Sequence, residues 1–216
     1  VGLATVGGWV FTTWLRVKNG YPLENSWGKA VYPKTGDEAM ERVKLISQEN
    51  AQLRAELGAT PIDLLLSNAG IGLETGQIGM LDFDHVQRIV QTNTLGPLKL
   101  VDTLVDNVAA SALRRIVLVS SRMGSIGNNL SGGHYGYRAS KAGLNAIGRS
   151  LAIDLFRRGI TVVMLHPGRV NTAGGGGADA PLGAEQSVGA MRRTLARLGN
   201  HETGVFCNYD GQVIAW

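Results

Sequence analysis

Residues 116–141, IVLVSSRMGSIGNNLSGGHYGYRASK, decide the fold of this chain. The apolar, β-branched run at residues 116–119 is short and ends at polar residues, which predicts a buried strand. Two serines and a glycine-rich loop follow it, and a helix is predicted to begin close to Tyr137. Because open α/β sheets bind ligands beyond the carboxyl ends of their strands, this stretch predicts a ligand site.

Tyr137 and Lys141 are four residues apart, so on a helix they lie on one face about one turn apart. A tyrosine titrates near 10, and a neighbouring ammonium favours the phenolate and lowers that pKa. Ser121 is placed to donate a hydrogen bond to an oxygen that gains charge during carbonyl reduction. The same spacing is common on solvated helix faces, so the strand and serines before it carry the prediction of an acid–base site.

Two motifs in this stretch resemble the short-chain dehydrogenase/reductase family: SSRMGS at residues 120–125 and YRASKA at residues 137–142. The segment GGHYGYRASKA looks most like the C-factor and carbonyl-reductase-like branch, and the resemblance covers about residues 60–216. It implies an α/β fold, namely a single Rossmann-like domain with a doubly wound parallel sheet.

The resemblance also implies hydride transfer between a nicotinamide cofactor and a ketone, an aldehyde or a secondary alcohol. Tyr137 would be the acid–base group, and Lys141 would lower its pKa and hold ribose hydroxyls. Ser121 would orient the carbonyl, because the family's catalytic serine is the second of the pair. The loop is about three residues longer than the commonest form of the family, which leaves Ser120 open as the alternative.

A fourth catalytic residue is implied within the predicted helix 82–108. Gly96 and Pro97 should weaken this helix and free nearby backbone carbonyls. In the resembled family an asparagine at this kink, here Asn93, relays protons through water to the lysine. Taken alone, Asn93 is a polar residue at a helix kink.

Cofactor contacts are implied at the ends of two further predicted strands. Ile62 to Leu66 is followed by SNAG at residues 67–70, where the family has Asn-Asn-Ala-Gly, and residues 160–165 are followed by HPGRVNT. The resemblance implies these cofactor-binding residues: Asn68, Ala69, Gly70, Tyr137, Lys141, Pro167, Gly168, Val170 and Thr172.

The N-terminal segment departs from the family. Its glycine pattern Thr-Gly-x-x-x-Gly-x-Gly does not occur in residues 1–36, where Gly2, Gly7 and Gly8 have the wrong spacing. A helix predicted at residues 37–57 leaves room for little more than one βαβ unit of roughly 30 residues before it. We expect one strand at residues 9–17. The predicted domain is therefore 1–216, with residues 1–36 atypical and 37–216 family-like.

The cofactor and substrate are predicted only as classes. The residue that selects NAD or NADP normally follows the second strand, and that position cannot be located here. On the resemblance, NADP(H) is preferred over NAD(H), with a small-molecule carbonyl or alcohol as substrate. A homodimer or homotetramer formed through the two long predicted helices, 82–108 and 136–157, is a further expectation.

Composition excludes several classes. Charged residues make up 18% of the 216 residues and the net charge is +4, without a basic run that would bind nucleic acid. Residues 1–17 are too short and too interrupted to span a membrane comfortably. The single cysteine, Cys207, fits a buried strand in a reducing, cytoplasmic compartment. No histidine or cysteine pair has metal-ligand spacing, so no metal is expected.

Two alternatives remain open. Without the glycine turn a dinucleotide loses its pyrophosphate anchor, which favours a catalytically impaired protein with a binding or regulatory role. The segment 1–36 also fits a truncated or aberrant reading of the gene.

Overall fold

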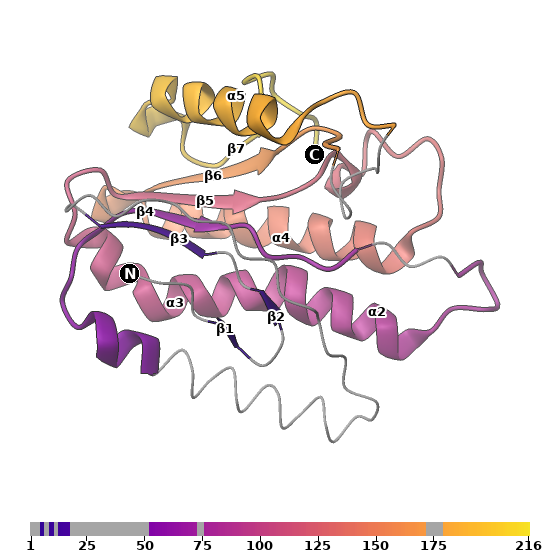
Figure 1. Cartoon of the computed structure of the whole chain (residues 1–216), viewed down its shortest axis with the longest axis horizontal. Helices are drawn as coiled ribbons and strands as arrows, with labels where there is room; N and C mark the ends of the chain where they lie inside the picture. Colours follow the sequence, from indigo (N-terminus) through magenta and orange to yellow (C-terminus); the bar gives the residue numbers. More distant parts are fainter. Residues whose placement is uncertain (1–4, 7–8, 11–12, 18–51, 73–75, 172–178) are drawn as a thin grey trace.

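The chain folds into a sheet covered by helices on both faces. A computed structural model describes the side chains and backbone of residues 52–72, 76–171 and 179–216, and the backbone alone of residues 5–6, 9–10 and 13–17. Figure 1 shows α5 on one face of the sheet and α2, α3 and α4 on the other. This three-layer arrangement confirms the predicted Rossmann-like α/β fold.

The main sheet has five strands in the order β3-β4-β5-β6-β7. Strands β4 to β7 are parallel, whereas β3 is antiparallel to β4. The predicted strands at 62–66, 116–119 and 160–165 are confirmed to within one residue at either end. The bounds are β3 Thr13–Val17, β4 Ile62–Ser67, β5 Arg115–Val119, β6 Thr161–His166 and β7 Val205–Asn208.

The prediction of a single strand at residues 9–17 is wrong. The strand β2, Trp9–Val10, pairs with β1, Thr5–Val6, whereas β3 pairs with β4 of the main sheet. Apolar, β-branched composition indicates extended backbone and does not say which neighbour each part pairs with. The glycines considered for a phosphate turn, Gly2, Gly7 and Gly8, lie outside the described residues.

The kinked helix predicted at 82–108 is confirmed, and its kink is a π-helical turn. Asp82 is the N-cap of α2, since its Oδ1 accepts a hydrogen bond from the backbone N–H of His85 at 3.0 Å. Residues 52–57 are helical, and the rest of the helix predicted at 37–57 lies outside the described residues. The bounds are α2 Phe83–Val90, the π-helical turn Gln91–Leu95, α3 Gly96–Ala109, α4 Tyr135–Asp154 and α5 Ala184–Arg197.

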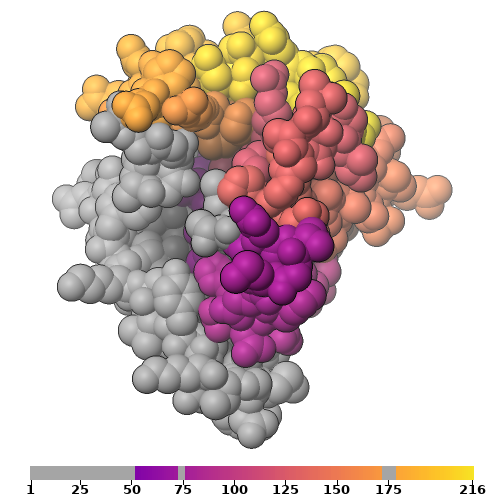
Figure 2. All heavy atoms as spheres, turned by 90° about the vertical axis from the view of Figure 1, so that its right-hand side faces the viewer, coloured from indigo at the N-terminus to yellow at the C-terminus, as the bar shows by residue number. Residues whose placement is uncertain are grey.

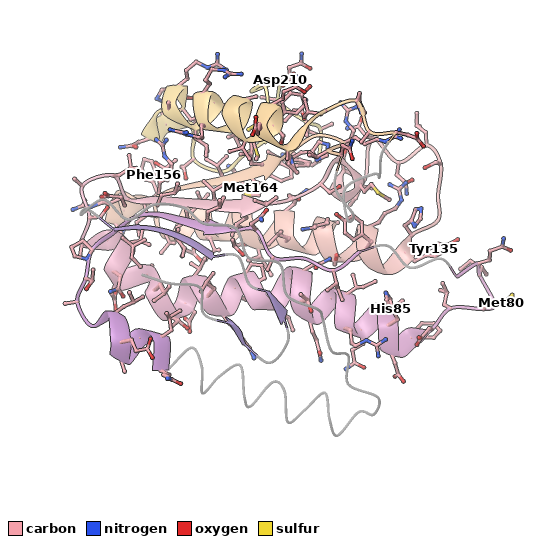
Figure 3. All side chains as sticks on the ribbon, viewed as in Figure 1. Met80, His85, Tyr135, Phe156, Met164 and Asp210 are labelled. Carbon is pink, nitrogen blue, oxygen red and sulfur yellow. The ribbon has the colours of Figure 1, made fainter. Side chains whose placement is uncertain are left out.

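Alternation along the strands divides the core between the two faces of the sheet. Leu118 and Met164 belong to the cluster that includes residues of α3 and α4, and Val117 belongs to the cluster that includes residues of α5. Met164, labelled in Figure 3, packs so closely on α4 that Gly148 has no room for a Cβ. Cys207 is fully buried, and burial first, then the charges of two nearby carboxylates, raises its pKa to about 11. The predicted location of this thiol in a strand is confirmed.

Candidate active site

The carboxyl ends of β4, β5 and β6 meet at one edge of the sheet, because these strands are parallel and adjacent. Each strand is followed there by a segment that the sequence analysis singled out: residues 67–70, 120–125 and 166–171. Figure 2 faces this edge, with C-terminal residues in yellow above the segment that follows β5. The strand order therefore brings the predicted site residues of three separate segments to one place.

Ser121 is the serine of the pair that faces Tyr137. It is 8% exposed, and its side chain hydrogen-bonds the phenol of Tyr137. Its Oγ also accepts a bond from the backbone N–H of Met123 at 3.2 Å, which begins a short 3-10 turn at Arg122–Gly124. Ser120 instead donates to Oδ1 of Asn145 at 2.6 Å. The two serines thus have different partners, and Ser121, the predicted catalytic serine, is the one bonded to Tyr137.

Tyr137 and not Tyr135 lies at the site. Tyr135 is the first residue of α4 and is 43% exposed at the outer end of that helix (Figure 3). Burial raises the pKa of Tyr137, and the hydrogen bond from Ser121 opposes this rise. The net shift of the Tyr137 pKa is therefore upward, opposite to the predicted lowering. The desolvation of the phenol outweighs the effect of its neighbours.

Lys141 is buried beneath the site. The side chain is 4% exposed, and its Nζ donates to the carbonyl oxygen of Val119, the last residue of β5, at 2.9 Å. The Nζ lies 5.9 Å from the ring centroid of Tyr137. Because burial penalises the charged form, the pKa of Lys141 falls to about 8. At neutral pH the ammonium is still mainly protonated and close to the phenol.

Asn93 lies at the centre of the π-helical turn and is fully buried. Its Oδ1 accepts from the backbone N–H of Ile71 at 2.8 Å, and its Nδ2 donates to the carbonyl oxygen of Ile71 at 3.1 Å. Pro97 has no N–H, so the Asn93 carbonyl lacks the usual helical donor four residues later. Asn93 therefore fixes the segment after β4 and reaches the site from beneath it.

The segment after β4, residues 68–70, is largely exposed at the carboxyl edge of the sheet. Asn68 and Gly70 are exposed and Ala69 is half-buried. A Cβ placed on Gly70 would lie 3.2 Å from Oδ1 of Asn93 and 3.6 Å from Nζ of Lys141. The bare backbone at residue 70 thus runs directly past the polar atoms of two predicted catalytic residues, and an ammonium beside exposed backbone fits the ribose end of a nicotinamide dinucleotide.

The segment after β6 is held from the other side. The carbonyl oxygen of Pro167 accepts a bond from Oγ of Ser187 at 2.6 Å, and Val170 pairs with Leu182. Gly168 has φ +87°, and a Cβ there would lie 2.8 Å from the ring of Tyr209. Thr172, predicted as a cofactor contact, lies outside the described residues.

Two histidines, His134 and His166, border the segments that carry these residues. His134 precedes α4 in a left-handed conformation, with φ 52°. His166 ends β6, and its Nδ1 is buried without a hydrogen-bond partner among the described residues. Burial first, then the charges of Arg122 and Lys141, lowers the pKa of His166 to about 4. The imidazole of His166 is therefore neutral at neutral pH and adds no positive charge to the site.

Sequence reasoning missed Ser140 and Thr94. Ser140 is fully buried, and its Oγ accepts a bond from Nδ2 of Asn93 at 3.1 Å. Thr94 donates from its Oγ1 to the carbonyl oxygen of Ser140 at 2.8 Å. The one available signal is that Ser140 immediately precedes Lys141, and this does not reveal a partner 47 residues away.

Comparison with known proteins supports the same reading. The profile of the short chain dehydrogenase family matches residues 31–180, which is more than half of the chain. The chain belongs to the short-chain dehydrogenase family. This is a family of oxidoreductases that bind nicotinamide dinucleotides. The matched range includes all four residues predicted to be catalytic.

Similar proteins include C-signal and carbonyl reductases. C-signal of Myxococcus xanthus is 40% identical over 156 residues, which are 72% of this chain and 93% of that protein. The carbonyl reductase Sniffer of D. melanogaster superposes with a TM-score of 0.74 at 34% identity, over 80% of this chain and 74% of that one. The NADPH-bound carbonyl reductase from chicken fatty liver gives 0.72 at 29%, over 86% and 85%.

In the part of the chain that the structure describes, no helix is long and apolar enough to cross a membrane. Among the same residues, no three histidine, cysteine, aspartate or glutamate side chains gather where they could hold a metal ion.

Proposed function

We propose that this chain is an NADP(H)-dependent oxidoreductase that reduces a ketone or aldehyde, or oxidises the corresponding secondary alcohol. The observation that carries the proposal is the group formed by Ser121, Tyr137 and Lys141 at the carboxyl ends of β4 and β5. A protonated phenol and a serine hydroxyl next to a buried ammonium suit a substrate oxygen that gains charge and then a proton. The NADPH-bound structural relative supports NADP(H) over NAD(H).

The bound dinucleotide supplies the hydride, and the protein supplies positions, charges and a proton. Tyr137 holds the transferable proton, and its raised pKa keeps the phenol protonated at neutral pH. This state suits the reducing direction, in which the phenol donates. Ser121 shares a hydrogen bond with that phenol and orients the substrate carbonyl towards it.

Lys141 has two tasks in this proposal. Its ammonium stabilises negative charge that develops on the Tyr137 oxygen, and it binds ribose hydroxyls. The exposed backbone at residues 68–70 and the segment Pro167–Val170 would bind the rest of the nicotinamide half, together with Thr172. Asn93 would hold a relay water through its backbone and keep the segment after β4 in place.

The test is the substitution Tyr137→Phe, which removes one oxygen from the site. We expect NADPH-dependent reduction of an aldehyde panel to fall by at least about a hundredfold, because general acid catalysis contributes roughly 10²–10⁴-fold. NADPH should still raise the melting temperature of both proteins, by roughly 5–10 °C at 100 times the dissociation constant. Equal turnover by the variant would contradict the role of Tyr137.

A second candidate is a binding or regulatory protein that no longer catalyses. Two observations favour it: the similarity to C-signal, and the absence from residues 1–36 of the family's glycine pattern. It predicts a cooperatively folded protein whose melting temperature is unchanged by NADPH and by NADH. Self-association through the two long predicted helices, 82–108 (α2 to α3) and 136–157 (α4), stays a prediction under both candidates.

A further inference from the structure

We infer that Ser140 is a positioning residue that links Asn93 to the first turn of α4 and so sets the geometry of Tyr137 and Lys141. The inference rests on the proposed function, since it concerns how the same site is held. Ser140 is fully buried, so it touches neither substrate nor solvent. Any effect that it has on the reaction must pass through its hydrogen-bond partners.

The hydroxyl of Ser140 joins two predicted catalytic residues directly. Its Oγ donates to the backbone carbonyl of Tyr137 at 2.8 Å and accepts from Nδ2 of Asn93 at 3.1 Å. The Tyr137 carbonyl is also the position that accepts the helical bond from the N–H of Lys141. One hydroxyl is therefore bonded to Asn93 and to the backbone turn that carries both the tyrosine and the lysine.

The chain of bonds continues beyond Asn93 to the segment after β4. The remaining polar atoms of the Asn93 side chain bond both backbone groups of Ile71. Gly70, the preceding residue, runs past Oδ1 of Asn93 and Nζ of Lys141. A continuous path of hydrogen bonds thus runs from Ile71 through Asn93 and Ser140 to Tyr137, across three segments of the chain.

A second contact holds the π-helical turn against α4. Thr94 donates to the carbonyl oxygen of Ser140 at 2.8 Å. Gly143 permits it, because a Cβ on Gly143 would lie 3.1 Å from Cγ2 of Thr94. The π-helical turn puts the consecutive residues Asn93 and Thr94 both against α4, and π-helical turns of this kind often occur at functional sites.

Removing the hydroxyl leaves a buried donor of Asn93 without a partner. The cost of such a group is comparable to that of a lost hydrogen bond, and it favours a new position for the amide. Because Asn93 also holds Ile71, the segment that borders the cofactor side would move with it. Misplacements of this kind lower the rate of the reaction more than they lower binding.

The test compares Ser140→Ala with Ser150→Ala, a matched control on the same helix. Ser150 donates from its Oγ to a backbone carbonyl, that of Ala146, at 3.2 Å, but it is exposed and far from Asn93. With NADPH and 4-nitrobenzaldehyde as the probe, we expect kcat of Ser140→Ala to fall roughly 10- to 100-fold with KM nearly unchanged. Ser150→Ala should match the wild type.

Two further measurements separate positioning from simple destabilisation. Adding Ser140→Ala to Asn93→Ala should cost little more than Asn93→Ala alone, since both act on one path. The amide of Ile71, bonded to Asn93, should exchange its hydrogen faster in Ser140→Ala than in Ser150→Ala. Ser140→Cys, which keeps a weak donor of similar size, should recover part of the lost kcat.

The outcomes separate this inference from the proposed function. A wild-type protein that reduces no probe overturns the proposed function, and Ile71 exchange then decides the link by itself. An active wild type with equal kcat in Ser140→Ala and Ser150→Ala overturns the inference alone. Fully additive losses in the double variant, or unchanged exchange at Ile71, would also overturn it.

Discussion

Polar side chains of two kinds can be compared: buried ones at the carboxyl end of the sheet and an exposed ion-pair cluster at its amino end. At the carboxyl end, Asn93, Ser140 and Lys141 are each no more than 4% exposed, and each has defined hydrogen-bond partners. At the amino end, the carboxylate of Asp106 is 64% exposed and pairs with Arg54 and Arg158 at 3.2 and 2.7 Å. The buried hydrogen bonds fix the positions of the side chains, but removing these polar groups from water costs free energy. The exposed ion pairs change the stability of the protein little.

The difference indicates where substitutions matter. Buried polar groups cannot exchange a lost partner for water, so their bonds determine geometry. Exposed ion pairs are screened and replaceable. Proteins of this architecture bind ligands at the carboxyl end of the sheet, and in this chain Asn93, Ser140 and Lys141 are buried at that end.

The largest effect is expected from Gly124→Ala. A Cβ on Gly124 would lie 2.7 Å from the backbone carbon of Lys141 and 2.8 Å from its carbonyl oxygen. Backbone cannot rotate away, so the 3-10 turn would move off α4 and take Ser121 away from Tyr137. We expect turnover to fall on the order of a hundredfold and the free energy of unfolding to fall by about 1–3 kcal/mol.

Gly189→Ala is the control for this substitution. Gly189 lies within α5, and a Cβ there meets only the flexible end of Arg193 at 3.5 Å. Alanine should raise stability by about 1 kcal/mol, since glycine is a poor helix former, and leave turnover unchanged. Wild-type turnover in Gly124→Ala would show that Ser121 needs no support from the turn.

Much of the site was predictable because its signals are local. The strand at β5, the spacing of Tyr137 and Lys141, and the kink before Pro97 all come from neighbouring residues. The pKa of Tyr137 was predicted in the wrong direction, because burial depends on how α4 packs against the rest of the protein. The bond between Ser140 and Asn93 was missed for the same reason, since it joins residues 47 positions apart.

A change in stability with pH is the next largest effect, and it comes from Lys141. Its pKa is about 8 when folded and about 10.4 in an unfolded chain. Between these values the unfolded chain holds the proton that the folded protein has released, so stability rises with pH across this window. The gain is about 3 kcal/mol, and below about pH 8 the cost of the buried charge is fully present.

The measurement is urea unfolding of the wild type and Lys141→Met between about pH 7 and pH 10. The variant has no titrating group at this position, so the difference between the two proteins isolates Lys141. We expect the free energy of unfolding of the wild type to rise relative to that of the variant as the pH rises. A difference that is constant with pH would mean that the ammonium is solvated and not buried.

The smallest effect tests the other end of the sheet with two adjacent residues. Asp106→Ala removes both exposed ion pairs of the amino end, and we expect its melting temperature to stay within experimental scatter of the wild type. Asn107→Ala removes a side chain that is 4% exposed and donates to the carbonyl oxygens of Gly58 and Thr60 at 2.8 and 2.9 Å. Its loss removes two hydrogen bonds worth about 0.5–1.5 kcal/mol each, so stability should fall by about 1–3 kcal/mol.

The Arg158 hydrogen bond, then its charge, lowers the pKa of Asp106, so the pair does exist at neutral pH. We expect this ion pair to contribute little to stability because its side chains are exposed. Poor geometry is not the reason, since the distance between Arg158 and Asp106 is 2.7 Å. Scanning calorimetry of both variants at low and high salt checks this reasoning. If Asp106→Ala destabilises the protein as much as Asn107→Ala, exposed ion pairs stabilise this protein as much as buried hydrogen bonds do.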